Sequence, residues 1–255
     1  MRLFVLSAGA LDADRSVIHP GDDSHRRVTL PVPILLIQTE GQNILVDTGL
    51  PIDVPGDPDA LKTVHEIDPA WIRSDATAEQ RVDRQLGFLG LLPADIDLVV
   101  NTHFHFDHAG GNALFPGVPI AAQEAELIAA RESDGYLPVW DAPGLQFRTV
   151  RGDWSPVEGV EFLFTPGHSA GHQSLLIRTG DQPWLFTVDA VYTEEHWRRG
   201  LLGAVSDIAA ARESLARLHA IVESEGARVV FGHDAAQWDS LLKGQSGRPV
   251  LLVET

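Results

Sequence analysis

Short runs of apolar residues, separated by polar or glycine-containing turns, recur along the chain and predict β-strands. Residues 34–37 and 44–46 are two such runs, and the Glu40-Gly41-Gln42 sequence between them predicts a hairpin turn. The other runs are residues 98–100, 160–164, 174–177, 184–188 and 229–231. Continuous apolar runs of this length are typical of strands that are buried on both faces.

Three segments are predicted to be helical, over residues 78–89, 121–131 and 207–225. In the last of them, apolar residues at spacings of three and four form one helix face. These residues are Ile208, Ala211, Leu215, Leu218 and Val222. Ser206 or Asp207 can cap the start of this helix, and Gly226 can end it. Because the helices alternate with the strands, we expect a layered α/β architecture.

The composition narrows the possible functions. The chain has 255 residues, of which 36 are acidic and 19 are basic, so its formal net charge is −17. This charge argues against a surface that binds nucleic acid or anionic membranes, because such a surface needs clustered lysine and arginine. The chain contains no cysteine, which excludes disulfides, thiolate metal ligands and cysteine nucleophiles. Histidine and carboxylate side chains remain as candidates for chemistry.

No repeat, low-complexity segment or change in composition divides the chain, so we expect a single domain over residues 1–255. No apolar run approaches the roughly 20 residues of a membrane span. Residues 3–6 follow Arg2 and faintly resemble a signal peptide, but this run is shorter than the usual apolar core of roughly 7–15 residues. We therefore expect a first β-strand here, in a cytoplasmic protein.

Residues 51–80 form the least regular stretch of the chain, with four prolines, many aspartates and only scattered apolar residues. We interpret this stretch as a long loop or lid that contains a helical turn. Loops of this length in compact domains are usually functional, so we expect it to cover part of a binding site.

Histidine and aspartate residues follow the ends of four predicted strands. They are His103, His105, Asp107 and His108 after residues 98–100, His168 after residues 160–164, Asp189 after residues 184–188, and His233 after residues 229–231. In layered α/β folds, functional side chains converge at strand ends. We therefore expect these seven residues to meet at one rim of the fold.

This set of residues predicts a metal site. Imidazole nitrogens and carboxylate oxygens are suitable ligands for zinc, manganese, iron or cobalt. Seven ligands exceed the coordination of one tetrahedral ion, so two ions that share a bridging carboxylate fit better. An isolated histidine more often packs in the core or caps a turn, but packing does not explain the density of histidines in residues 103–108.

The His-x-His-x-Asp-His motif of residues 103–108 resembles the signature of the metallo-β-lactamase superfamily. Residues 45–49 (LVDTG), 165–168 (TPGH) and 232–233 (GH) are similar to the other motifs of that superfamily, in the same order. The resemblance extends from about residue 30 to residue 234, which is most of the chain. It implies an αββα sandwich, in agreement with the alternating strands and helices.

Within the superfamily, the chain is most similar to the N-acyl homoserine lactonases. Residues 101–112 and 165–174 resemble theirs throughout, and Tyr192 follows Asp189 by three residues, as in that family. The resemblance implies a quorum-quenching hydrolase that opens the lactone ring of N-acyl homoserine lactones by attack of a metal-bridging hydroxide. The expected partner is thus a small-molecule lactone, and the expected assembly is a monomer or homodimer.

The same resemblance implies a role for each site residue. The first metal ion is held by His103, His105 and His168, the second by Asp107, His108 and His233, and both by Asp189. Two divalent ions are implied, with zinc preferred over manganese, iron or cobalt. Asp107 is expected to relay a proton to the departing ring oxygen, and Tyr192 to donate a hydrogen bond to the developing oxyanion. Phe106 is expected to contact the substrate, because it lies inside the ligand motif.

Other residues are candidates for supporting the site or lining a substrate groove. Asp47 has two interpretations, as a group that orients a ligand imidazole or as a turn-forming residue, and His172 is expected to be structural. An acyl chain needs an apolar groove, for which Trp71, Phe88 and Trp140 are further candidates. Core packing would explain each of these aromatic residues equally well.

Several alternative functions stay open. Another lactonase of the same group, such as one that opens 4-pyridoxolactone, would share these motifs. A phosphotriesterase or a glyoxalase II-like thioesterase could use the same dinuclear site. A binding protein without catalytic activity would be expected to lack a ligand, and the set is complete. We therefore expect an enzyme.

Overall fold

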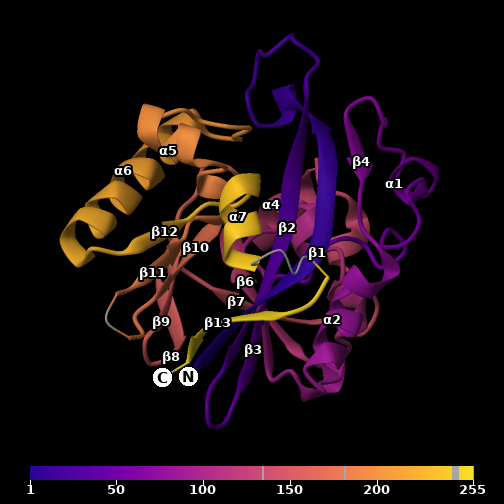
Figure 1. The fold of residues 1–255 in the computed structure, drawn as a ribbon. Helices are drawn as coiled ribbons and strands as arrows, with labels where there is room; N and C mark the ends of the chain where they lie inside the picture. The colour runs from indigo at the N-terminus through magenta and orange to yellow at the C-terminus, as the bar shows by residue number, and fades with distance from the viewer. Residues whose placement is uncertain (134, 181, 243–246, 255) are drawn as a thin grey trace.

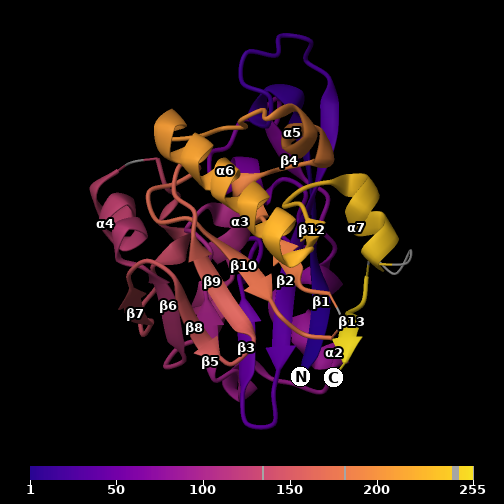
Figure 2. The same ribbon diagram turned by 90° about the vertical axis from the view of Figure 1, so that its left-hand side faces the viewer.

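The computed structural model describes residues 1–255 except 134, 181, 243–246 and 255. Two β-sheets face each other, and helices cover the outer face of each sheet (Figure 1). Figure 2 looks onto helix α6 (Ile208–Glu225), with the second sheet behind it. This arrangement is the predicted αββα sandwich.

The first sheet has eight strands. The strand order is β13-β1-β2-β3-β5-β6-β7, and β4 pairs with β1 away from this path. The strands are β1 (Arg2–Asp14), β2 (Arg27–Gln38), β3 (Asn43–Val46), β4 (Ile72–Ser74), β5 (Leu98–Val100), β6 (Pro119–Gln123), β7 (Gln146–Val150) and β13 (Val250–Glu254). Strands β3, β5, β6 and β7 are mutually parallel, whereas β13, β1, β2 and β3 alternate in direction.

The second sheet has five strands in the order β12-β11-β10-β9-β8. They are β8 (Trp154–Val157), β9 (Val160–Phe164), β10 (Gln173–Ile177), β11 (Trp184–Phe186) and β12 (Arg228–Val230). Only the β11–β12 pair of this sheet is parallel among the described residues.

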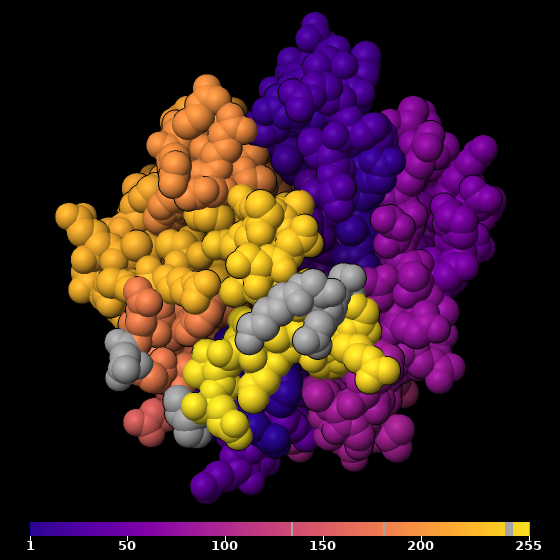
Figure 3. Space-filling view, viewed as in Figure 1, coloured from indigo at the N-terminus to yellow at the C-terminus, as the bar shows by residue number. Residues whose placement is uncertain are grey.

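The other helices are shorter than α6. The α-helices are α1 (Ala60–Thr63), α2 (Val82–Phe88), α3 (Phe106–Ala109), α4 (Glu124–Glu132), α5 (Glu194–Arg199) and α7 (Ala235–Leu242). The 3-10 turns are η1 (Arg15–Val17), η2 (Ala78–Gln80), η3 (Pro93–Asp95), η4 (Asn112–Leu114), η5 (Pro138–Trp140) and η6 (Val188–Ala190). In the space-filling view, α7 covers the front between the two halves, and the turn between β1 and β2 projects beyond the body (Figure 3).

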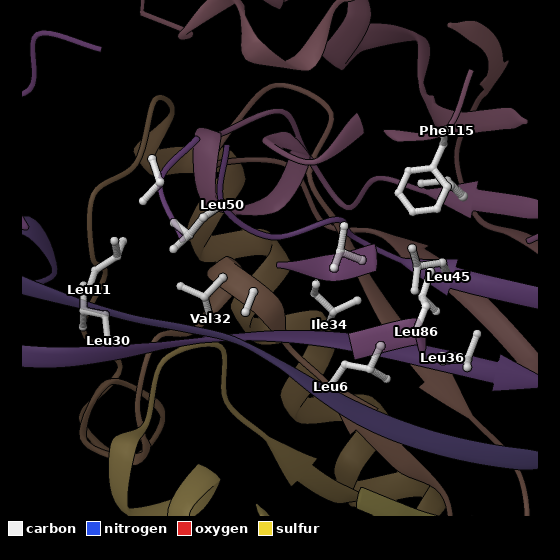
Figure 4. Close-up of a cluster of buried hydrophobic side chains, with 14 of the residues drawn as sticks. Leu6, Leu11, Leu30, Val32, Ile34, Leu36, Leu45, Leu50, Leu86 and Phe115 are labelled. Carbon is white, nitrogen blue, oxygen red and sulfur yellow. The ribbon is translucent and has the colours of Figure 1, made fainter. Parts of the chain in front are cut away.

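Alternate residues of the first sheet face different layers. In β1, Phe4 and Leu6 belong to the outer cluster that also contains Leu86 of α2, part of which is drawn in Figure 4. Leu3 and Val5 face the second sheet. Because side chains alternate along a strand, burial on both faces requires apolar residues at consecutive positions. This explains the continuous apolar runs in the sequence.

Helix α6 covers the outer face of the second sheet. Its residues Leu215 and Leu218 pack in one cluster with Leu163 of β9. The Asp207 side chain accepts hydrogen bonds from backbone N–H groups of the first turn, and Gly226 ends the helix in the left-handed conformation with φ of 65°. These features confirm the predicted boundaries of this helix.

Two other predicted helices are partly wrong. Residues 78–89 contain the turn η2 and the helix α2, separated by extended backbone at Arg81. Residues 121–123 belong to β6, and the helix there starts at Glu124. Pairing of β6 with β5 and β7 stabilises the extended conformation, and this tertiary pairing overrides the helical preference of the two alanines.

Residues 51–80 were expected to be a loop with a helical turn, and α1 is such a turn. Strand β4 in the same stretch was not predicted. It is three residues long and pairs with the far end of β1, so its partner lies about 60 positions away in the sequence, as in the pair Ser74 and Leu11. A short polar strand of this kind leaves no periodic signal of its own.

The N-terminal segment forms β1 between β13 and β2, which confirms that a strand was the correct interpretation. Within the residues that the structure describes, no helix is long and apolar enough to cross a membrane.

Candidate metal centre

Parallel strand pairs bring the predicted ligand loops together. Val46 of β3 pairs with Val100 of β5, so the segments beginning at Asp47 and Asn101 leave the first sheet side by side. In the second sheet, the parallel pairing of β11 with β12 does the same for the segments that carry Asp189 and His233. The seven predicted ligands therefore meet where the two sheets present these strand ends to each other.

Three histidine nitrogens converge at one side of the centre. His103 Nε2 lies 3.1 Å from His105 Nδ1 and 3.1 Å from His168 Nε2. The His168 and His105 nitrogens are 2.8 Å apart. Nitrogens that bind one tetrahedral zinc ion at ~2.0–2.1 Å lie roughly 3.3 Å apart, so this spacing fits a shared ion.

A second group consists of Asp107, His108 and His233. Asp107 Oδ2 lies 3.6 Å from His108 Nε2 and 3.9 Å from His233 Nε2. Their ligand atoms all lie within 4.8 Å of one another. This group therefore has the spacing of a second ion site.

Asp189 lies between the two groups. Its Oδ1 is 3.3 Å from His108 Nε2 and 3.1 Å from His233 Nε2. Its Oδ2 is 3.4 Å from His168 Nε2 and 3.9 Å from His103 Nε2. Each carboxylate oxygen thus faces one group, which is the geometry expected of a bridging ligand.

Two buried atoms at this point lack a hydrogen-bond partner among the described residues. They are His108 Nε2 and Asp189 Oδ1. An unpaired buried polar atom is unfavourable by about 1–3 kcal/mol, so two of them 3.3 Å apart indicate a missing partner. A divalent cation provides such a partner for both, and the residues present therefore fit metal ions.

The protonation preferences differ between the two groups. Burial and the neighbouring His105 lower the pKa of His168 to about 4, and burial also lowers the pKa of His103 well below its usual value. These neutral imidazoles have lone pairs available for a metal ion. For His108 the carboxylates of Asp107 and Asp189 outweigh burial and raise its pKa, so this side of the centre favours positive charge.

Asp47 contacts the imidazole of a candidate ligand, His108. Its Oδ2 lies 2.8 Å from His108 Nδ1, and its two oxygens also accept hydrogen bonds from the backbone N–H and the hydroxyl of Thr102. With Nδ1–H donated to Asp47, the His108 Nε2 lone pair faces the centre. These contacts agree with the orienting interpretation of Asp47, and its left-handed backbone, with φ of 64°, agrees with the turn-forming one as well.

His172 does not point its nitrogens at a ligand group. Its Nε2 accepts a hydrogen bond of 3.1 Å from the backbone N–H of Asp189, and its Nδ1 lies 3.1 Å from the carbonyl oxygen of Thr165. It therefore supports the backbone of Asp189, as a structural histidine was expected to do. The preceding Val188 has φ of 49°, which is unfavourable for a β-branched residue and shows why this segment needs support.

Gly232 permits the close approach of the β12 end to this segment. A Cβ at position 232 would lie 2.5 Å from the carbonyl oxygen of Val188 and 3.2 Å from Asp189 Oδ1. Any larger residue would push His233 away from the carboxylate of Asp189.

Tyr192 lines the same pocket as the predicted ligands and is 5% exposed. Its hydroxyl oxygen lies 3.1 Å from His168 Nδ1, which also donates to the carbonyl of Ala204 at 2.8 Å. Burial and the carboxylates of Asp189 and Asp107 raise the pKa of Tyr192, so the phenol keeps its proton. Because His168 Nδ1 carries its hydrogen toward Ala204, it cannot accept from Tyr192, and the phenol O–H is left to donate into the pocket.

The pocket beside the centre has a volume of about 270 Å³. Its polar end is formed by His105, Asp107, His168, Asp189, Tyr192 and His233. Phe106 and Trp71 are part of the wall, in agreement with their predicted position. Trp71 comes from the 51–80 stretch, which therefore borders the pocket.

Two aromatic candidates for the groove lie elsewhere. Trp140 is buried and stacks on Phe104 with ring centroids 4.9 Å apart, so it belongs to the core. Phe88 is exposed on α2, with the guanidinium of Arg248 4.9 Å from its ring, and does not line the pocket. The prediction that Trp140 and Phe88 line the groove is therefore wrong. For Trp140, the alternative explanation, core packing, is confirmed.

Sequence reasoning missed part of the pocket wall. Leu11, Val17 and Leu30 line it from β1, η1 and β2. Apolar residues in long strands give no local sign that they face a cavity rather than the core. Only their proximity in space to the histidine motif would have identified them.

The comparisons with known proteins agree with this geometry. The metallo-beta-lactamase superfamily profile matches residues 27–233. An N-acyl homoserine lactonase from Bacillus cereus is 37% identical over 237 residues, which cover 92% of this chain and 94% of the relative. The N-acyl homoserine lactonase AttM from Rhizobium radiobacter is 33% identical over 257 residues, covering 95% of this chain and 97% of the relative.

Solved structures give the same result. A structure of an N-acyl homoserine lactone hydrolase with the product N-hexanoyl-L-homoserine at the catalytic metal centre superposes with a TM-score of 0.86 at 35% identity, covering 94% of this chain and 95% of the other. A variant of AiiA from Bacillus thuringiensis, with N-decanoyl-L-homoserine at the active site, also superposes with a TM-score of 0.86 at 35% identity and the same coverage. From its motifs, its fold and these relatives, the chain belongs to the metallo-β-lactamase superfamily and, within it, to the N-acyl homoserine lactonase family.

Proposed function

We propose that this protein is a dinuclear metal-dependent lactonase that hydrolyses the ring ester of N-acyl homoserine lactones. The observation that carries this proposal is the pair of ligand groups around Asp189 at the polar end of a pocket whose other walls are apolar. A molecule with a polar lactone head and an apolar acyl tail matches these two environments. The relatives with bound acyl homoserine products support the same substrate class.

Seven residues would hold the two ions. They are His103, His105 and His168 for the first, Asp107, His108 and His233 for the second, and Asp189 for both. When bound, two such ions supply a water-derived nucleophile at neutral pH and polarise an ester carbonyl. We propose zinc, because the donor set of nitrogen and oxygen atoms suits it, although manganese, iron and cobalt accept the same donors.

Tyr192 is the proposed hydrogen-bond donor to the carbonyl oxygen of the lactone. Its phenol is protonated and its O–H is not used by His168, which is itself a donor at Nδ1. The carbonyl oxygen gains negative charge as the nucleophile adds to the carbonyl carbon. A donor preorganised at that oxygen stabilises the transition state more than the ground state.

Asp107 is the proposed proton carrier. Its carboxylate lines the pocket next to His108 and His233. There it would take up the proton that the water-derived nucleophile loses after it adds to the carbonyl carbon. Ring opening breaks the bond between the carbonyl carbon and the ring oxygen, which would otherwise leave as a strongly basic alkoxide. A proton delivered by Asp107 turns that oxygen into the hydroxyl of the product.

The apolar wall is the proposed acyl-chain subsite. Phe106 lies within the ligand motif, and Trp71 and Leu11 line the same pocket. Trp71 is 51% exposed, which leaves its ring available to an alkyl chain that extends toward solvent. We propose that residues 51–80 act through Trp71 as one side of this groove.

A substrate panel tests the proposed function. Metal-loaded and chelator-stripped protein would be assayed for hydrolysis of short and long N-acyl homoserine lactones, 4-pyridoxolactone, a thioester and a phosphotriester. We expect kcat/KM to be highest for N-acyl homoserine lactones and to disappear with the metal. If kcat/KM is higher for 4-pyridoxolactone, the protein is still a lactonase but the assigned substrate is wrong. A preference for the thioester or phosphotriester would overturn the lactonase assignment.

A further inference from the structure

A buried carboxylate outside the predicted ligand set joins the two loops that carry the three-histidine group. Glu126 of α4 is fully buried. Its Oε1 accepts a hydrogen bond of 3.0 Å from the backbone N–H of Phe104. Its Oε2 accepts hydrogen bonds of 2.7 Å from the Ser169 hydroxyl and 2.7 Å from the backbone N–H of Gly171.

Two of these donors are next to the three histidines in the chain. Phe104 lies between His103 and His105, and Ser169 directly follows His168. One side chain therefore fixes the backbone on both sides of the point where the three histidine nitrogens converge. The nitrogens of His168 and His105 that would share an ion are 2.8 Å apart, and they come from the two loops that Glu126 ties together.

Residues around Glu126 pack closely enough to hold the two loops against it. A Cβ on Gly171 would lie 2.4 Å from both the Cβ and the backbone nitrogen of Glu126, so only glycine lets the loop approach α4 so closely. Phe104 is fully buried and stacks on Trp140 behind the loop. The loop is thus clamped between an aromatic stack and a carboxylate.

The chemistry of the contact requires a carboxylate. The donors to Glu126 are neutral, the Tyr136 hydroxyl among them. A buried carboxylate is favourable only when its oxygens accept hydrogen bonds and opposite charge is nearby. Cations at the adjacent histidines would provide that charge. Glutamine has the same shape but has an NH₂ in place of one oxygen. In either orientation this NH₂ would face the backbone N–H of Phe104 or of Gly171, so two donors would meet.

We propose that Glu126 is a positioning residue that preorganises the three-histidine half of the metal centre by tying the loop of His103 and His105 to the loop of His168. This proposal rests on the metal centre proposed above. Glu126 would hold the three-histidine group in place. Asp47, through its contact with Nδ1, does the same for His108. Removing such supporting groups typically lowers metal affinity by about 10–100-fold.

The test is cobalt binding to metal-stripped protein, followed by visible absorption in the presence of a competing chelator. It would use the His233→Ala background, in which the second group has lost one candidate ligand and the three-histidine group keeps all of its own. Glu126→Gln is expected to weaken that binding by about 10–100-fold and to change the cobalt absorption bands. Glu124→Gln is the matched control on the same helix, because Glu124 pairs with Arg151 at the surface, and it should leave the affinity within twofold.

Ser169→Ala removes one donor and leaves the carboxylate, so it should fold and weaken cobalt binding to a smaller degree than Glu126→Gln. If both Glu126→Gln and Ser169→Ala bind cobalt as tightly as their parent and lose only resistance to urea, Glu126 is a structural residue and the proposal is wrong. If the unmodified protein binds no cobalt, the metal centre itself fails, and that result is distinguishable from failure at Glu126 alone.

Discussion

For three of the five candidate-ligand histidines, a single hydrogen bond decides which ring nitrogen faces the proposed metal centre. Three of the histidines have Nδ1 within 2.8 Å of an oxygen outside the centre and so direct Nε2 inward. The pairs are His108 with Asp47, His168 with Ala204, and His233 with Pro31. A neutral imidazole has one N–H and one lone pair, so donation at Nδ1 leaves the lone pair at Nε2 for an ion.

Tyr192→Phe removes the proposed donor without changing the shape of the side chain. We expect kcat/KM for N-acyl homoserine lactones to fall on the order of 100-fold, because a preorganised donor to a developing oxyanion is worth roughly this much. The metal content should be unchanged. Steady-state kinetics alongside metal analysis would check this, and full activity in a metal-replete variant would show that the hydroxyl does not contact the reacting carbonyl.

His172 predicts a pH dependence of stability. Burial and the neighbouring His168 lower the pKa of His172 from 6.5 to about 3 in the folded protein. Between these values the unfolded chain binds a proton at this histidine and the folded chain does not, so the free energy of unfolding falls as the pH is lowered through this window. Below about pH 3 this contribution stops changing.

The variant His172→Gln cannot bind this proton in either state. Urea unfolding of metal-free protein between pH 7 and pH 4 should therefore show a shallower loss of stability for the variant, by up to a few kcal/mol. The metal-free form is needed because metal binding is itself coupled to proton release. Parallel curves for the two proteins would contradict the role of His172.

At the scale of elements, the pocket depends on segments that are distant in sequence. Strand β4 pairs with the far end of β1, and the 51–80 stretch that contains it brings Trp71 to the pocket wall. Leu11 and Leu30 reach the same wall from the paired strands β1 and β2. The histidine motif lies at the polar end of the pocket, whereas these elements shape the part that would hold the acyl chain.

Trp71→Ala should therefore alter acyl-chain preference more than turnover. We expect kcat/KM for a long-chain lactone to fall about 10-fold relative to a short-chain lactone, since each buried methylene contributes about 0.8 kcal/mol. Phe88→Ala is the control, because Phe88 is also exposed and aromatic but lies outside the pocket. Equal effects on long and short chains would exclude Trp71 from the acyl-chain subsite.

At the scale of the whole molecule, the proposed metal centre joins the two sheets. His103, His105, Asp107 and His108 follow β5 of the first sheet, whereas His168, Asp189 and His233 follow strands of the second. Ions bound to both sets would connect the halves of the sandwich. Metal binding to the folded state alone should therefore stabilise the fold.

Removal of the metal should lower the melting temperature. An ion present at 100 times its dissociation constant contributes about 2.7 kcal/mol, which corresponds to a shift of at least about 5 °C for a domain of this size. Thermal unfolding with and without chelator would measure the shift. The His168→Ala variant should respond less than the unmodified protein, and an identical response would place the stabilising ion elsewhere.

Much of the fold and the reactive end of the site could be predicted from local patterns. The 103–108 motif contains four of the seven candidate ligands, so its chemistry is visible without any tertiary information. The boundaries of α6 followed from its caps, Asp207 and Gly226. Strand β4 and the β6 segment could not be predicted in this way, because their conformations depend on pairing with distant strands.

The amino-acid sequence by itself determined the kinds of candidate ligand and their order, because donor atoms and strand-end motifs are local properties of the chain. Tertiary structure decided which oxygen of Asp189 faces which group, and that Glu126 contacts both histidine loops. It also decided that Trp71 lines the pocket whereas Trp140 is buried in the core. These outcomes depend on contacts between segments tens of residues apart, and such contacts exist only when the two sheets pack together.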